Sequence, residues 1–168
     1  MRIYVIILVL FLVHKSRSEI VEQIVEAIVM LPSIPADGFK FFYLNSNLGK
    51  DNIIEIKYGD EQSIMQHWIK DAPLKLTTHG WDTSVDSKSN EQSLVVEINY
   101  AYVAVGGFNI ISVDWSVVAM DPKYPQPAAL TVAVGAVIAT FLERVADITK
   151  INPYDIHLIG YIVSVLTY

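Results

Sequence analysis

A strand that ends on a glycine is the first place where this sequence could hold catalytic chemistry. Residues 154–160 read YDIHLIG, an apolar run that predicts a buried strand. When the pattern G-x-S-x-G follows such a strand, the turn lifts a serine oxygen above the sheet for attack on an ester. Here Gly160 is followed by Tyr161 and then by Ile162 at the nucleophile position. An isoleucine side chain has no nucleophilic atom, which excludes acyl transfer through this turn.

Ser164 is the nearest hydroxyl after this glycine, at the position of the pattern's second glycine. The run from Ile162 to Leu166 is largely β-branched and contains no glycine, so it favours a continued strand over a tight turn. A displaced nucleophile would also need a base within hydrogen-bond reach. We therefore expect no catalytic role for Ser164.

Two further polar residues, His79 and Asp114, stand at the ends of predicted strands, where sites form in open α/β sheets. His79 could act as a general base, but no serine partner or orienting acid can be predicted for it. A role in structuring its loop is favoured, as is a structural hydrogen bond for Asp114. His157 lies within the apolar run described above and is predicted to be packed and hydrogen-bonded. His67 is predicted to lie on the surface.

Apolar periodicity predicts the elements that position these residues. Two β-rich runs around an Asn/Gly/Asp cluster indicate an antiparallel hairpin, and strands then alternate with helices. That alternation favours parallel β-α-β units with the hairpin toward one edge of the sheet, so the expected fold class is α/β. The predicted strands span residues 39–44, 53–58, 74–78, 108–115 and 155–160. One predicted helix follows a capping box at 89–92 and ends at the double glycine 106–107, and a second spans 128–149.

The N-terminal 36 residues read as segments outside the main domain. A basic start, an apolar stretch from Ile3 to Val13 and small residues at 16 and 18 predict a secretory signal peptide over residues 1–18. The stretch is too short to span a bilayer. Residues 19–36 carry a helical apolar stripe and then prolines, so they form either an N-terminal helix or a propeptide. We expect an extracellular, secreted protein.

Charge and cysteine content exclude several classes of function. The net charge is −6, and loss of residues 1–18 would remove three basic residues and no acidic ones. Such a negative net charge does not provide the basic surface that binds the phosphates of nucleic acid. The chain has no cysteine, so it can form neither a disulfide nor a thiolate metal site. A secreted domain of this kind must be stabilised by its core alone.

Four blocks in matching order and spacing resemble the pancreatic-lipase family. Within that family, the secreted insect lipases and the venom-type phospholipases A1 look closest. The resemblance covers residues 37–160, about the first half of such a catalytic domain, and implies a partial α/β-hydrolase sheet. The four blocks are LTTHGW (76–81), NIISVDW (109–115), VGA (134–136) and DIHLIG (155–160).

The resemblance implies a secreted serine hydrolase that cleaves carboxylic esters of lipids, either triacylglycerol or the sn-1 ester of phospholipids, without a metal or organic cofactor. In this family two backbone N–H groups hold the oxyanion. These correspond to Trp81, after the His-Gly pair, and to Val163, after the nucleophile position. The elbow usually reads G-H-S-L-G, whereas this chain reads GYIVS over residues 160–164.

The departures at the elbow lead to three hypotheses. The family places its catalytic aspartate, lid and catalytic histidine beyond Tyr168, so we expect a truncated, inactive form whose residues 161–168 are a divergent tail. The alternative is a non-catalytic secreted lipid-binding or storage protein. The third possibility is a chain without molecular function, because half of a hydrolase sheet exposes an edge that favours aggregation.

Overall fold

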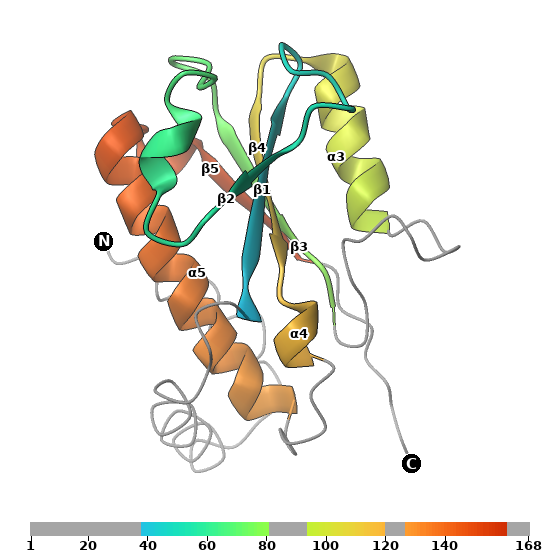
Figure 1. Cartoon of the computed structure of the whole chain (residues 1–168), viewed down its shortest axis with the longest axis vertical. Coiled ribbons are helices and arrows are strands. Elements are labelled where there is room, and N and C mark those ends of the chain that lie inside the picture. The colour runs from blue at the N-terminus through green and yellow to red at the C-terminus, as the bar shows by residue number, and fades with distance from the viewer. Residues whose placement is uncertain (1–37, 81–93, 120–126, 161–168) are drawn as a thin grey trace.

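A five-stranded mixed sheet forms the centre of the protein (Figure 1). The computed structural model describes residues 38–80, 94–119 and 127–160. The strand order is β2-β1-β4-β3-β5. The strands are β1 (Lys40–Asn45), β2 (Ile54–Ile56), β3 (Leu74–Thr78), β4 (Asn109–Asp114) and β5 (Ile156–Gly160). The helices are α3 (Leu94–Val105), α4 (Ser116–Ala119) and α5 (Pro127–Thr149), with short 3-10 turns η3 (Glu61–Ile64) and η4 (Pro153–Asp155).

The connections confirm the α/β class. Strands β3, β4 and β5 run parallel, and the chain crosses between them through α3 and α5. Strands β1 and β2 form the expected antiparallel hairpin, and β1 joins the parallel strands by pairing antiparallel with β4 over its whole length. The hairpin therefore occupies one edge of the sheet and β5 lies at the other end of the strand order. The segment 19–36, predicted as an N-terminal helix or a propeptide, and the predicted capping box at 89–92 lie outside the described residues.

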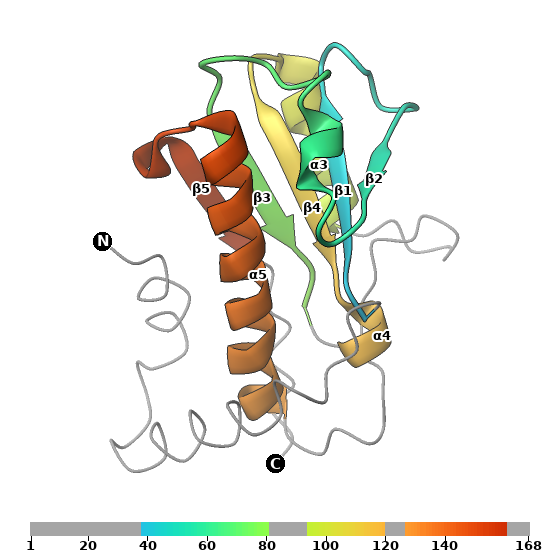
Figure 2. The ribbon, with the colours of Figure 1, turned by 60° about the vertical axis from the view of Figure 1, so that its left-hand side comes forward.

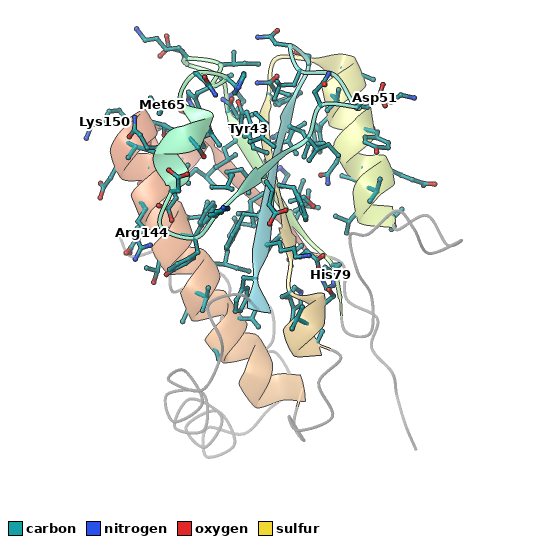
Figure 3. All side chains as sticks on the ribbon, viewed as in Figure 1. Tyr43, Asp51, Met65, His79, Arg144 and Lys150 are labelled. Atoms are coloured by element: carbon teal, nitrogen blue, oxygen red, sulfur yellow. The ribbon has the colours of Figure 1, made fainter. Side chains whose placement is uncertain are left out.

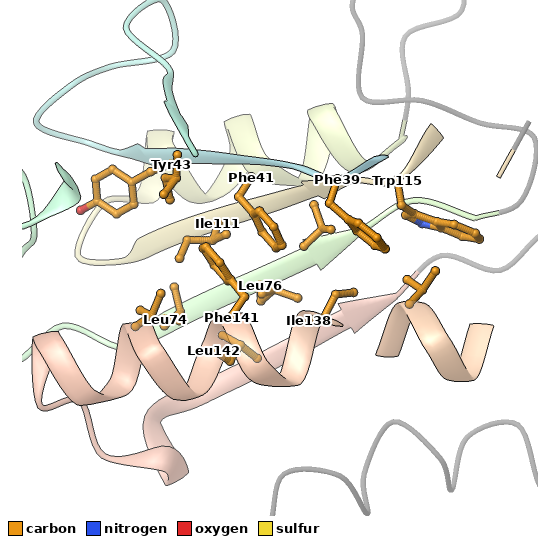
Figure 4. Close-up of a cluster of buried hydrophobic side chains, with 14 of the residues drawn as sticks. Phe39, Phe41, Tyr43, Leu74, Leu76, Ile111, Trp115, Ile138, Phe141 and Leu142 are labelled. Carbon is orange, nitrogen blue, oxygen red and sulfur yellow. The ribbon is translucent and has the colours of Figure 1, made fainter. Parts of the chain in front are cut away.

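One face of the sheet packs against α5 (Figures 2 and 4). Because side chains alternate between the faces of a strand, the odd-numbered residues of β1 and β4 point to this side. Phe41 of β1 stacks on Phe141 of α5, with ring centroids 3.7 Å apart and planes at 9°. Both rings are fully buried. Gly135 and Ala139 of α5 are both buried.

The opposite face is covered by α3, which contacts β1, β3 and β4. Every residue of β4 is buried, as expected for a strand covered on both sides. The prediction of a buried final strand is wrong, because β5 is only half-buried and His157 is exposed. Position 157 shares the α3 side of the sheet with Lys75, its partner in register. The main strand contacts of α3 are with β1, β3 and β4, so the apolar sequence of β5 does not by itself bury this strand on both faces.

A double glycine ends α3, as its sequence predicts. Gly106 and Gly107 have φ of 79° and 76°, a region that L side chains rarely adopt. The N–H of Gly106 donates to the Tyr102 carbonyl at 3.0 Å, which closes the last turn of the helix. This reversal places the start of β4 beside β3, where the N–H of Asn109 donates to the Pro73 carbonyl at 3.0 Å.

A buried polar network closes the end of the sheet where β3 and β4 begin. The Tyr43 hydroxyl donates to Asn109 Oδ1 at 2.7 Å and lies 3.0 Å from the His67 carbonyl oxygen. Asn45 Nδ2 donates to the same hydroxyl at 2.8 Å and to the His67 carbonyl at 2.7 Å. Burial raises the pKa of Tyr43 to about 12, although hydrogen bonds from Asn45 and the backbone of Ile69 lower it in part.

Tyr43→Phe should lower the free energy of unfolding at neutral pH by about 1–3 kcal/mol, because it leaves buried partners unsatisfied. The difference in free energy of unfolding between the wild type and Tyr43→Phe should narrow as pH rises from about 10 to about 12. In that range the unfolded tyrosine loses its proton while the folded one keeps it, which destabilises only the wild-type chain. Urea unfolding at both ends of this range measures the effect, and a constant difference would contradict it.

Candidate functional site

The carboxyl ends of β3 and β4 bring together the two polar residues singled out by the sequence. Figure 3 labels the first of them, His79. His79 follows β3 directly, and Asp114 is the last residue of β4. His79 Nε2 lies 3.1 Å from Asp114 Oδ1, and both side chains are buried. The parallel pairing of β3 and β4 creates this contact between residues that are 35 positions apart.

Hydrogen bonds and a ring contact with neighbouring residues fix the position of the His79 side chain. Its Nδ1 lies 2.8 Å from the Gly80 carbonyl oxygen, so this nitrogen carries a proton and donates it. The Trp115 backbone N–H donates to Nε2 at 3.0 Å, and the Trp115 indole N–H donates to the His79 carbonyl at 2.9 Å. The two rings stack with centroids 5.4 Å apart and planes at 11°. The histidine and the tryptophan therefore hold the carboxyl ends of β3 and β4 together.

Asp114 connects these contacts to the start of α4. Its Oδ1 accepts the Ser116 N–H at 2.9 Å. Burial of the carboxyl group acts to raise the pKa of Asp114, but the hydrogen bonds with His79 and Ser116 outweigh it, and the net pKa lies below its ordinary value. The carboxylate is therefore ionised at neutral pH and structurally engaged, as predicted for a hydrogen-bonding role.

These contacts determine what the site can do chemically. A general base must offer a nitrogen to an incoming group. The His79 residue is only 2 % exposed, and both ring nitrogens already contact protein groups. The contacts therefore match the loop-structuring role expected for this residue.

The predicted oxyanion donor Trp81 and the nucleophile position Ile162 lie outside the described residues, as do Val163 and Ser164. The structure does describe the elements that lead to them, since Gly80 precedes the first and Gly160 ends β5 before the second. The registered pairing of Thr78 with Gly160 shows that β3 and β5 end side by side. The two segments therefore depart from adjacent strand ends.

The other two histidines of the described residues, His67 and His157, lie away from these strand ends. His157 Nδ1 lies 3.4 Å from Lys75 Nζ, near the beginning of β5. The same ammonium group stands over the rings of Tyr102 and Phe108, 5.5 Å and 5.0 Å from their centroids. His67 is half-buried, and its backbone carbonyl belongs to the Tyr43 network, so its predicted surface position is only partly correct.

Among the described residues, no group of three or more His, Cys, Asp or Glu side chains is placed to hold a metal ion. None of the helices in this part of the chain is both long and apolar enough to cross a bilayer.

The sequence pointed to His79 and Asp114 but not to the residues that complete their surroundings. Trp115 contributes two donors and a stacked ring, and Ser116 contributes a backbone donor. The signal that could have found them is the position of Asp114 at a strand end. An aspartate there readily caps the turn that follows by accepting the N–H two residues on.

A comparison with known families shows which protein family the chain belongs to. The family model described as Lipase matches residues 11–165, nearly the whole chain. The chain belongs to the lipase family. The match is consistent with the five-stranded α/β sheet and confirms the resemblance to the pancreatic-lipase family. No curated protein matches the chain. Lipase-family membership implies lipid esters as the class of molecule that such a fold handles.

The contact between His79 and Asp114 lies beside Gly80, the residue before the predicted oxyanion donor. Asp114→Asn should lower the free energy of unfolding at pH 7 by about 1–3 kcal/mol, because a charged acceptor is lost. A carboxylate with a lowered pKa stabilises the fold above its unfolded pKa, and this contribution is lost as pH falls through the folded pKa. The deficit of the variant should therefore shrink below about pH 4. Denaturant unfolding of wild type and Asp114→Asn at pH 7 and in acid measures this loss of stability. The control is Asp51→Asn at an exposed position, which should show neither the loss at pH 7 nor its pH dependence.

Proposed function

We propose that this lipase-family chain handles lipid esters or their fatty-acid products without hydrolysing them. The observation that supports the proposal is the residue sequence after β5. The strand ends at Gly160, and the second residue after it, where a serine nucleophile would stand, is Ile162. A hydrocarbon side chain cannot form an acyl-enzyme intermediate. The family's substrates, triacylglycerol or the sn-1 ester of phospholipids, indicate the class of ligand that this chain should bind. They do not imply that the chain hydrolyses them.

A hydrolysis assay tests the absence of turnover. The purified chain should release no p-nitrophenol from short-chain p-nitrophenyl esters, and no fatty acid from triacylglycerol or phosphatidylcholine emulsions, above a buffer blank. Ile162→Ser should not introduce activity, because the described His79 is committed to Gly80 and Trp115 and cannot activate a new serine. Turnover by the unmodified chain would overturn the proposal. Turnover only in the variant would show that Ile162 alone blocks the reaction.

Binding without turnover is the positive part of the proposal and needs its own experiment. Trp115, 5 % exposed beside His79, can report on a lipid near these strand ends. Vesicles of phosphatidylcholine containing a brominated acyl chain should quench tryptophan fluorescence in a saturable way. Trp115→Phe should remove part of this quenching, whereas Trp68→Phe, near the Tyr43 network, should leave it largely unchanged. Quenching that is absent, or equal in both variants, would contradict lipid binding at this site.

The sequence also supports secretion as part of the proposal. The basic start, the apolar stretch and the small residues before Glu19 have the composition of a cleaved signal peptide. Expression of the whole chain in a eukaryotic secretory host should place it in the medium. Mass spectrometry of its N-terminus should find Glu19 as the first residue. Retention of the chain in the cytosol with its first residues intact would contradict secretion.

A further inference from the structure

Lys75 carries a half-buried ammonium group that has no carboxylate partner among the described residues. The ion pairs in that part of the chain join Arg144 to Glu61 and His79 to Asp114. The whole sequence has 18 acidic and 12 basic side chains, so carboxylates are plentiful and this cation is still left without one. A partly desolvated ammonium group is stabilised by an opposite charge. Lys75 is therefore a candidate for binding an anion from outside the chain.

Two aromatic rings, from α3 and from the turn after it, hold this ammonium group in place. Lys75 Nζ lies 5.5 Å from the centroid of the Tyr102 ring and 5.0 Å from that of Phe108. The two rings meet edge to face, with centroids 5.2 Å apart and planes at 75°. Because these cation–π contacts already orient the long lysine side chain, less conformational freedom is lost when an anion binds. The charge is therefore preorganised beside an apolar surface.

His157 supplies a second donor at the same place. It is the partner of Lys75 in the β3–β5 register, and its side chain is exposed. His157 Nδ1 lies 3.4 Å from Lys75 Nζ, and an ammonium group can only donate, so Nδ1 is the acceptor of this contact. The proton of the neutral ring is then on Nε2. The ammonium group and the Nε2–H together match the two acceptor oxygens of a carboxylate.

We propose that Lys75 and His157 bind the carboxylate of a long-chain fatty acid, with the start of its hydrocarbon tail against Tyr102 and Phe108. The positive charge favours an anion, and the rings beside it favour an anion that carries a hydrocarbon chain. Ile159 extends the apolar surface, because it is half-buried two residues beyond His157 on the same face of β5.

This site is separate from the strand ends at His79. Lys75 is the second residue of β3, whereas His79 follows the last residue of that strand. The choice of a fatty acid rests on the proposed function, since it takes the class of ligand from there. The position of the site rests on the contacts of Lys75 and His157 alone.

Isothermal titration of the whole chain with dodecanoate, below its critical micelle concentration, tests the site. Lys75→Met keeps the apolar stem and removes the charge, so it should weaken binding by about tenfold. His157→Leu, at an exposed position, should weaken binding by about threefold, and it decides the matter if Lys75→Met does not fold. Lys57→Met removes the same charge from an exposed lysine after β2, at the other edge of the sheet, and should leave the affinity unchanged.

Two further probes test the class of ligand. Acetate, which lacks the tail, should not bind measurably under the same conditions. Dodecyltrimethylammonium has the same tail with a positive head and should bind at least about tenfold more weakly than dodecanoate. Equal affinity for either probe, absence of saturable dodecanoate binding, or unchanged affinity in both Lys75→Met and His157→Leu would overturn the proposal.

The outcome is independent of the vesicle experiment on Trp115. Quenching of Trp115 together with dodecanoate binding that ignores Lys75 would overturn this site and leave the proposed function in place. Dodecanoate binding that depends on Lys75, without quenching of Trp115, would support this site and contradict lipid binding at the strand ends beside His79.

Discussion

Phe141→Ala should lower the free energy of unfolding by about 3–5 kcal/mol, one of the two largest effects expected for this protein. Phe141 is fully buried on α5 and meets Phe41 of the sheet face to face, with centroids 3.7 Å apart. A face-to-face arrangement is not the geometry that aromatic quadrupoles favour. The stabilisation therefore comes mainly from burial and close packing, and removal of the ring leaves a cavity between sheet and helix.

A conservative variant and an exposed control make this prediction sharp. Phe141→Leu keeps most of the buried hydrocarbon and should cost about 1–2 kcal/mol, because burial rather than ring stacking stabilises this contact. Tyr154→Ala, at a position that is 83 % exposed, should change the free energy of unfolding by about 0.5 kcal/mol or less. Guanidinium unfolding monitored by circular dichroism measures all three. A loss below about 1 kcal/mol for Phe141→Ala would show that the helix is not anchored through this ring.

The fold was predictable where local signals and tertiary context agree. Residues 74–78 follow a proline and alternate in the way that a strand requires, and β3 has the predicted bounds. The double glycine after Val105 ends α3 where expected. The apolar run that became β5 shows the opposite case. Its composition predicts burial, but burial depends on whether a helix covers the strand, and the main strand contacts of α3 are with β1, β3 and β4.

The candidate site was predictable only in part, because its contacts are made across strands. The sequence placed His79 and Asp114 at strand ends, but their contact depends on β3 and β4 being neighbours in parallel. The two Trp115 donors depend in addition on the direction in which the chain leaves β4. Strand order and exit direction are set by long-range packing, which residue spacing alone does not encode.

The polar network at the other end of the sheet was not predicted, and its centre is Asn109. Asn45 and Asn109 are aligned in the β1–β4 register, and both are fully buried. Asn109 Oδ1 accepts from the Tyr43 hydroxyl and from the Ile69 N–H, at 2.7 Å and 2.9 Å. Its Nδ2 donates to the carbonyl oxygens of Ile69 and Ala72, at 2.9 Å and 3.2 Å. All four hydrogen-bonding positions of the amide are therefore used.

Asn109→Asp replaces one buried N–H₂ group by oxygen and should cost about 3–5 kcal/mol at neutral pH, the second of the two largest effects. The new oxygen would face two carbonyl oxygens, and an ionised carboxylate would be buried without a cation among the contacts of this side chain. Only the protonated acid could donate to either carbonyl. Burial should therefore raise the pKa of the introduced carboxyl group above its ordinary value.

The pH dependence of this variant distinguishes its mechanism from a simple loss of packing. A carboxyl group with a raised folded pKa costs least at low pH, where it is protonated in both states, and the penalty grows as pH rises above its unfolded pKa of about 4. The difference from wild type, measured by urea unfolding at about pH 4 and pH 7, should therefore be larger at pH 7. Asn52→Asp makes the same chemical change at an exposed amide that donates to the Leu48 carbonyl, and should cost about 0.5–1 kcal/mol. Two results would show that the Asn109 amide is not the centre joining the Tyr43 network to the start of β4. One is a loss of unfolding free energy equal to that of Asn52→Asp, and the other is a loss that does not change with pH.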